Sequence, residues 1–155
     1  MTMSAEAKLK SLGIELPAAP RPVANYVTAI EVGDVLYVSG HGPAPAPGVK
    51  THGRVGEDLT VEEGYQAARR TGLGILATVR ARLGSLDRVE QVVKLLGFVN
   101  AGPEFQEHPK VINGCSDLFV EVFGDRGRGA RSALGAGSLP DSIATEIEAI
   151  FLVGN

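Results

Sequence analysis

Apolar residues recur along the chain with two different periods, and these periods predict its helices and strands. In segments 60–84 and 109–124, apolar or small residues follow the three- and four-residue spacing of one helical face. Thr60 and Glu63 fit the capping box that begins a helix, and Pro109 suits the first turn of the second helix. The sequence therefore predicts two long helices.

Shorter runs rich in Val, Ile, Leu and Phe predict strands around these helices. They cover residues 27–32, 35–39, 89–100, a run that begins at Arg131, and 143–153. Gly33 and Asp34 predict a tight hairpin between the first two strands. The run over 89–100 is apolar at nearly every position, which is typical of a central strand buried on both faces.

The predicted order is strand, strand, helix, strand, helix, strand, strand, which indicates an α+β fold. We expect a mixed β-sheet with the two helices packed on one face. The opposite face then needs a cover of its own. A second copy of the chain is the economical cover, so a homo-oligomer is expected.

Length and charge narrow the class of protein. The 155 residues suit one domain over 1–155, with a short helical extension over about residues 1–16 in which Ser4 would cap a helix. A net charge of -3 gives no general attraction to nucleic acid or anionic membranes. The single cysteine excludes an internal disulfide. With no secretory signal and no run of roughly 20 apolar residues, a cytoplasmic location is expected.

Two carboxylates inside the last apolar run are the main candidates for chemistry. Side chains alternate along a strand, so Glu146 and Glu148 should share one face while Ile147 points to the other. The turn residues 138–141 predict a hairpin that would bring Arg131 beside them. We therefore expect an arginine–glutamate pair on a sheet face, either as a binding site or as a structural ion pair.

The remaining polar motifs give weaker signals. The spacing of the three histidines matches no metal motif, and the chain lacks a nucleotide-binding glycine motif, so neither a metal nor a cofactor is expected. Cys115 lies on the apolar stripe of its helix and is expected to be a buried hydrophobe. The arginine- and glycine-rich segment 125–131 could bind RNA phosphates, but it has no interleaved aromatic residue, which favours a solvated loop.

Several short motifs, taken together, resemble the RidA (YjgF) family of reactive-intermediate deaminases, once described as L-PSP endoribonucleases. The most specific are Ala130-Arg131-Ser132 and the later Glu146-Ile147-Glu148-Ala149-Ile150. Supporting matches are Tyr26, Val38-Ser39-Gly40 and Val111-Ile112-Asn113. The resemblance runs from about Tyr26 to Val153, and the N-terminal extension is similar to the longer branch of the family.

The resemblance implies a chorismate-mutase-like fold and a homotrimer whose sheets form a central barrel, with ligand clefts between subunits. Arg131 would grip the carboxylate of a 2-imino acid or enamine, and Glu146 would position the hydrolytic water, giving a 2-oxo acid and ammonia. Residues expected around the ligand are Tyr26, Ser39, Gly40, His41, Asn113 and Ala133. Many family members carry Gln in place of His41 and Cys in place of Ala133, and both differences bear on the substrate. The alternatives are an RNA-cleaving protein and a non-catalytic trimer that binds small carboxylates.

Overall fold

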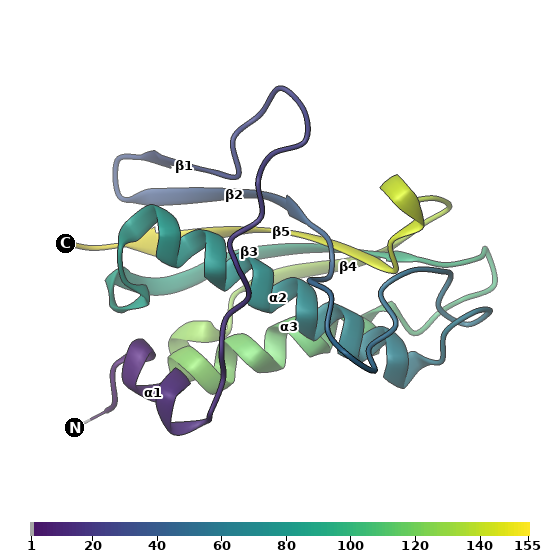
Figure 1. Cartoon of the computed structure of the whole chain (residues 1–155), viewed down its shortest axis with the longest axis horizontal. Coiled ribbons are helices and arrows are strands. Elements are labelled where there is room, and N and C mark those ends of the chain that lie inside the picture. The colour runs from purple at the N-terminus through teal and green to yellow at the C-terminus, as the bar shows by residue number, and fades with distance from the viewer. Residues whose placement is uncertain (1) are drawn as a thin grey trace.

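The computed structural model describes residues 2–155 and contains one five-stranded mixed sheet (Figure 1). The strands are β1 (Ala29–Val32), β2 (Val35–His41), β3 (Val89–Asn100), β4 (Ala130–Ala136) and β5 (Thr145–Val153). The helices are α1 (Ala5–Ser11), α2 (Val61–Leu83) and α3 (His108–Phe123). Short 3-10 turns are η1 (Leu86–Arg88), η2 (Gly124–Gly127) and η3 (Pro140–Ser142). Each predicted helix and strand is therefore present.

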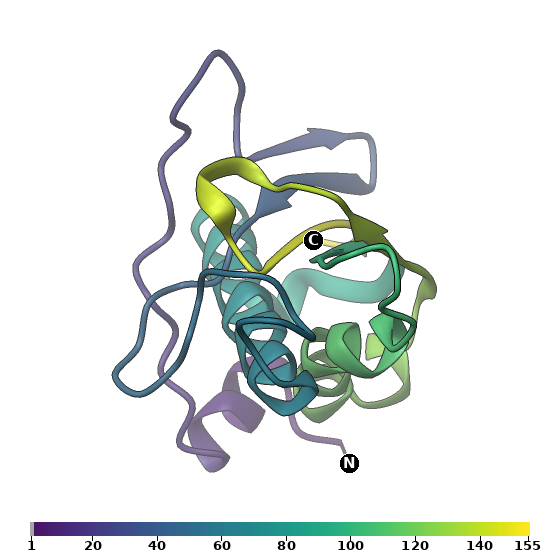
Figure 2. The ribbon, with the colours of Figure 1, turned by 90° about the vertical axis from the view of Figure 1, so that its right-hand side faces the viewer.

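The strands lie in the order β1-β2-β5-β3-β4. β3 and β4 are parallel and are joined through α3, whereas β5 runs antiparallel to both of its neighbours, β2 and β3. The two long helices lie side by side on one face of the sheet (Figures 1 and 2). The prediction of a mixed sheet with two helices on one face is confirmed.

The predicted hairpin between the last two strands is wrong. β4 pairs in parallel with one edge of β3, and β5 pairs with the opposite edge of β3. The turn at 138–141 exists as η3, with Asp141 and Ser142 at positive φ, but it carries the chain across the end of β3. The turn residues determine that the chain reverses there, and they do not determine which strand becomes the neighbour.

Local signals correctly placed the ends of the helices. The Thr60 hydroxyl accepts a hydrogen bond from the Glu63 amide at 3.1 Å, and the Glu63 carboxylate accepts one from the Thr60 amide at 3.0 Å. Gly84 ends α2 at a φ of +85°, a conformation that favours glycine. The Ser4 side chain caps α1 through the Ala7 amide. These contacts confirm the predicted caps.

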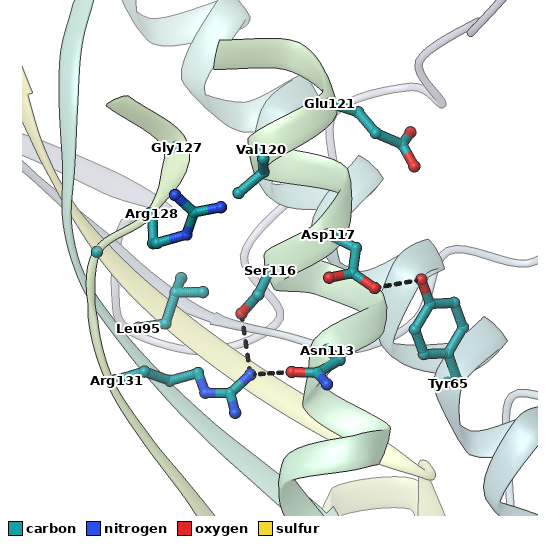
Figure 3. A pocket seen from close by; sticks show the side chains of 11 residues that line it. Tyr65, Leu95, Asn113, Ser116, Asp117, Val120, Glu121, Gly127, Arg128 and Arg131 are labelled. Atoms are coloured by element: carbon teal, nitrogen blue, oxygen red, sulfur yellow. Dashed lines mark hydrogen bonds between the residues drawn. The ribbon is translucent and has the colours of Figure 1, made fainter. Parts of the chain in front are cut away.

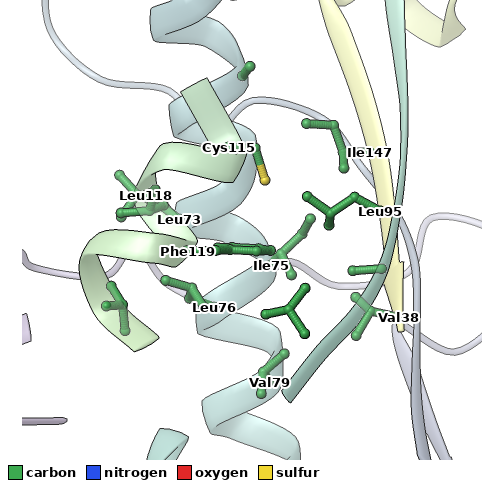
Figure 4. Close-up of a cluster of buried hydrophobic side chains, with 14 of the residues drawn as sticks. Val38, Leu73, Ile75, Leu76, Val79, Leu95, Cys115, Leu118, Phe119 and Ile147 are labelled. Carbon is green, nitrogen blue, oxygen red and sulfur yellow. The ribbon is translucent and has the colours of Figure 1, made fainter. Parts of the chain in front are cut away.

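The hydrophobic core fills the space between the sheet and the two long helices (Figure 4). Phe119 of α3 meets Phe151 of β5, with ring centroids 5.8 Å apart. Cys115 lies fully inside this core, as predicted, and burial raises the pKa of its thiol well above the ordinary range. A thiol in this state acts as a small hydrophobic group rather than as a nucleophile.

The face of the sheet opposite the helices is uncovered and partly apolar. Its side chains include large hydrophobic residues that are about half exposed, namely Ile30, Val32, Tyr37 and Leu134. The register of the paired strands places these groups on the same side as Glu146 and Glu148. Within residues 2–155, no helix has the length and apolar character needed to cross a membrane.

The contact between α2 and α3 depends on a glycine that leaves no room for a side chain. A Cβ at Gly114 would overlap the Tyr65 carbonyl oxygen and lie 2.9 Å from the Arg69 amide nitrogen. We expect Gly114→Ala to lower the free energy of unfolding by about 2–3 kcal/mol, because α3 must move away from α2. Denaturant unfolding at fixed protein concentration measures this change.

Gly137→Ala is the matched control, because a Cβ there has no neighbour within 4 Å. Its free energy of unfolding should stay within about 0.5 kcal/mol of the wild type. Equal stability of Gly114→Ala and Gly137→Ala would contradict the close packing of the helices.

Candidate functional site

Arg131 projects from β4 toward α3 and is held there by two side chains of that helix (Figure 3). Its Nη1 donates to the Asn113 Oδ1 at 2.7 Å and to the Ser116 Oγ at 3.1 Å. Asn113 and Ser116 lie three residues apart, so both side chains leave the same face of α3. The helix thus holds the guanidinium in one orientation.

The other edge of this guanidinium remains available. Within residues 2–155, neither Nε nor Nη2 of Arg131 donates a hydrogen bond to another residue. Nε and Nη2 lie side by side in the planar fork and can grip both oxygens of a carboxylate. Arg131 is therefore oriented by α3 and free to bind an anion, which is the arrangement that a carboxylate clamp needs.

Arg131 lies at one side of a pocket of about 470 Å³ between α3 and the chain that enters β4 (Figure 3). Arg128 and the backbone of Gly127 and Gly129 form part of its wall. Across from them, Tyr65 donates to the Asp117 carboxylate at 2.7 Å, and this bond raises the pKa of Tyr65 to about 12. The phenol of Tyr65 therefore stays protonated at neutral pH.

Glu146 lies on the face of the sheet opposite the helices. Along β5, it alternates with Thr145 and Ile147, which are buried against the helices. Its carboxyl group packs on Gly40 of β2, where an added Cβ would lie 3.1 Å from the carboxyl carbon. Gly40 thus makes room for the Glu146 side chain, and a larger residue there would displace it.

Glu146 is held less acidic than an ordinary glutamate. Partial burial raises the pKa of its carboxyl group, and the nearby charge of Glu148 raises it further. Glu148 lies two residues along β5 on the same face, as the sequence predicted, and it is exposed. A carboxyl group with a raised pKa is a stronger base once ionised, which suits a group that accepts a proton from water.

The other predicted ligand residues fall into two groups. Tyr26, Ser39 and Gly40 come from the segment before β1 and the end of β2, and Gly40 contacts Glu146. Asn113 and Ala133 belong instead with Arg131, because Asn113 binds Arg131 and Ala133 follows two residues later on β4.

The ring of His41 lies on the helix side of the sheet and is bonded to the first group through the Ser39 carbonyl oxygen. Its side chain is only 4% exposed and points toward α2. Both ring nitrogens have partners inside the protein, at the Ser39 carbonyl and the Thr78 hydroxyl.

The two groups lie on opposite faces of one sheet. Arg131 is in register with Leu95, which is buried against the helices, whereas Glu146 is in register with Phe98 on the other face. β3 also separates their strands. The expected arginine–glutamate pair within one chain is therefore wrong, because β4 joins the far edge of β3 and presents Arg131 to α3.

Sequence reasoning missed the residues that support Arg131. Ser116 was not predicted, although it follows Asn113 by three residues, a spacing that places both on one helical face. The pocket residues Asp117 and Arg128 were not predicted as site residues either. Within residues 2–155, no group of three or more His, Cys, Asp or Glu side chains is arranged to hold a metal ion.

Comparison with known proteins identifies the family. A family model described as "YjgF/chorismate mutase-like, putative endoribonuclease" matches residues 6–146. The chain therefore belongs to this family, which confirms the predicted RidA (YjgF) resemblance and the chorismate-mutase-like fold.

Individual relatives match over most of their length. Protein TCP17 of Trypanosoma cruzi is 46% identical over 150 residues, which is 96% of this chain and 94% of that protein. A 2-iminobutanoate/2-iminopropanoate deaminase of Dermatophagoides farinae is 28% identical over 140 residues, covering 90% of this chain and 94% of the deaminase. The solved structure of a "putative endoribonuclease" from Shewanella oneidensis is 32% identical with a TM-score of 0.91, covering 97% of this chain and 100% of that one.

The effect of Glu148 on Glu146 can be measured directly. We expect Glu148→Gln to lower the pKa of Glu146, because it removes a negative charge that opposes ionisation. A carbon-detected NMR titration of the glutamate carboxyl groups measures this pKa. Glu90→Gln, on the exposed start of β3, is the matched control and should leave the titration of Glu146 unchanged. The same titration curve in wild type and Glu148→Gln would contradict the electrostatic coupling.

Proposed function

We propose that the protein hydrolyses reactive 2-imino or enamino acids to 2-oxo acids and ammonia. The observation that carries this proposal is the Arg131 guanidinium, which α3 orients while its Nε–Nη2 edge remains free. Such an edge matches the planar carboxylate that every 2-imino acid carries. The similarity to a 2-iminobutanoate/2-iminopropanoate deaminase supports the same class of reaction.

The reaction needs only positioning and a base. An enamine becomes the imine by gaining a proton at carbon and losing one from nitrogen. Water adds to the C=N carbon as a C–O bond forms, and the proton lost by water passes through Glu146 to the nitrogen, which gives a carbinolamine. The hydroxyl proton of the carbinolamine then passes through Glu146 to the nitrogen as the C=O bond forms, the C–N bond breaks and ammonia leaves. The raised pKa of Glu146 favours this proton transfer. Orientation and acid–base catalysis together provide the rate gain.

The site is formed between subunits in this proposal. Within one chain, Arg131 faces α3 and Glu146 faces the uncovered side of the sheet, so one ligand cannot reach both. A neighbouring copy supplies the missing half, with Arg131 and Asn113 from one subunit and Glu146, Gly40 and Tyr26 from the next. The half-exposed apolar side chains on the uncovered face support an assembly in which the sheets form the interior of a homotrimer.

The structure gives less support to RNA cleavage. In the loop before β4, Arg126 donates to the Val89 carbonyl oxygen at 3.0 Å. Arg128 pairs with Asp125 at 3.1 Å. A phosphate would have to compete with these partners, and no aromatic side chain lies between the two arginines to stack on a base.

Removing the clamp tests the proposed function. We expect Arg131→Ala to lower kcat/KM for imine hydrolysis roughly 10- to 100-fold, because the ligand loses a charge-assisted hydrogen-bond pair. The imine is generated in place by a pyridoxal-dependent dehydratase acting on serine or threonine, and its decay and the released ammonia are followed. Arg82→Ala removes an arginine of α2 that pairs with Glu31 outside this pocket and should retain nearly full activity.

The same assay separates the competing functions. Equal hydrolysis by wild type and Arg131→Ala would contradict the clamp. Binding of 2-oxobutyrate in a thermal-shift assay without hydrolysis would instead identify a non-catalytic carboxylate-binding protein. Cleavage of RNA that depends on Arg126 and Arg128 would favour the nuclease alternative.

A further inference from the structure

We propose that His41 is a positioning residue: from the core it fixes the backbone at Ser39 and Gly40, and it thereby sets the position of Glu146. The inference rests on the proposed function for the reaction that Glu146 serves. The structural arrangement itself is independent of the substrate. It depends on a bulge in β2, a buried chain of hydrogen bonds and the packing of Gly40 against Glu146.

β2 contains one extra residue where it reaches the site. Val38 is in register with Ala149, and the next recorded pair is His41 with Ile147, so three steps along β2 match two steps along β5. This mismatch is a β-bulge, and it involves Ser39 and Gly40. Without the extra residue, strand alternation would place residue 40 on the helix side after Leu36 and Val38. The bulge puts His41 there instead.

The imidazole of His41 connects this bulge to α2. Its Nδ1 lies 2.6 Å from the Ser39 carbonyl oxygen, and its Nε2 lies 2.7 Å from the Thr78 hydroxyl. A carbonyl oxygen can only accept, so Nδ1 carries the proton, and in the neutral ring Nε2 accepts from Thr78. Burial lowers the pKa of His41, which keeps the ring neutral at physiological pH.

Two residues of α2 lie beside the His41 ring. Gly74 and Thr78 are four residues apart and therefore lie on the same face of the helix. A Cβ at Gly74 would lie 3.8 Å from the His41 Cδ2, an ordinary van der Waals distance, so the ring lies beside this face of the helix. The orientation of the imidazole is thus fixed by a rigid helix of 23 residues rather than by a loop.

Ser39 connects the His41 ring to the other predicted ligand residues near Glu146. Its hydroxyl donates to the Val27 carbonyl oxygen at 2.6 Å, and its amide donates to the Thr28 carbonyl oxygen at 2.9 Å. These bonds tie the bulge to the segment that carries Tyr26. On the other side, Gly40 packs against the carboxyl group of Glu146. The buried His41 therefore restrains the backbone at Ser39 and Gly40, and through Ser39 it also restrains the segment that carries Tyr26.

Four variants test this role. His41→Leu removes both ring hydrogen bonds, whereas His41→Asn places an amide where Nδ1 was and can still donate to Ser39. Thr78→Val removes the partner of Nε2. Val79→Ala is its matched control, because Val79 also lies buried on α2, next to Thr78, and its side chain has no hydrogen bond to lose.

We expect kcat/KM for imine hydrolysis to fall roughly 10- to 100-fold in His41→Leu, since small displacements of a catalytic group cost this much. The loss should be smaller in Thr78→Val, activity should be largely retained in His41→Asn, and Val79→Ala should resemble the wild type. By NMR, the amide signals of Ser39 and Gly40 should shift in His41→Leu and Thr78→Val. The pKa of Glu146 should fall in both as its carboxyl group becomes more exposed.

The inference is overturned if the Ser39, Gly40 and Glu146 signals stay unchanged in folded His41→Leu or Thr78→Val. It is also overturned if Val79→Ala changes them equally, because the effect would then be general destabilisation. If His41→Leu fails to fold, Thr78→Val and His41→Asn decide the question. Absence of hydrolysis in the wild type would overturn the proposed function, while the NMR titration of Glu146 would still decide whether His41 positions it.

Discussion

The parallel pairing of β3 with β4 determines where the two halves of the candidate site lie. Because α3 carries the chain back to the outer edge of β3, β4 becomes an edge strand and Arg131 meets α3. β5 enters on the opposite edge of β3, with Glu146 pointing to the uncovered face. The backbone hydrogen bonds of the sheet fix both directions, so no side-chain movement within one chain could unite the two groups.

Each half of the candidate site is supported by a different helix. α3 holds the Arg131 guanidinium through Asn113 and Ser116. α2 holds the imidazole of His41 through Thr78, and His41 in turn restrains the bulge beside Glu146. Because both supports belong to the packed core, each half is preorganised before any ligand arrives. In the proposed assembly, association of subunits then completes the site without requiring either half to fold around the substrate.

The sequence predicted the features that depend on neighbouring residues. The Thr60 capping box, the Gly33-Asp34 hairpin and a central strand at 89–100 all follow from local preferences, and the structure contains each of them. The predicted burial of that strand on both faces is wrong within one chain, because only its helix side is covered and Val93 is 41% exposed. The partner of β4 could not be predicted in this way, since a turn does not specify which strand lies beside it. The bulge at Ser39 and Gly40 was also missed, because one extra residue moves His41 to the other face without any local signal.

In the proposed function, Arg131 and Glu146 act together from different subunits. Co-expression of Arg131→Ala and Glu146→Gln chains with two different tags, followed by selection for both tags, isolates mixed assemblies. We expect each variant alone to have strongly reduced activity and mixing to restore part of it, since in a mixed trimer about one third of the sites combine an intact Arg131 with an intact Glu146. Mixed assemblies that remain as inactive as either variant alone would contradict it.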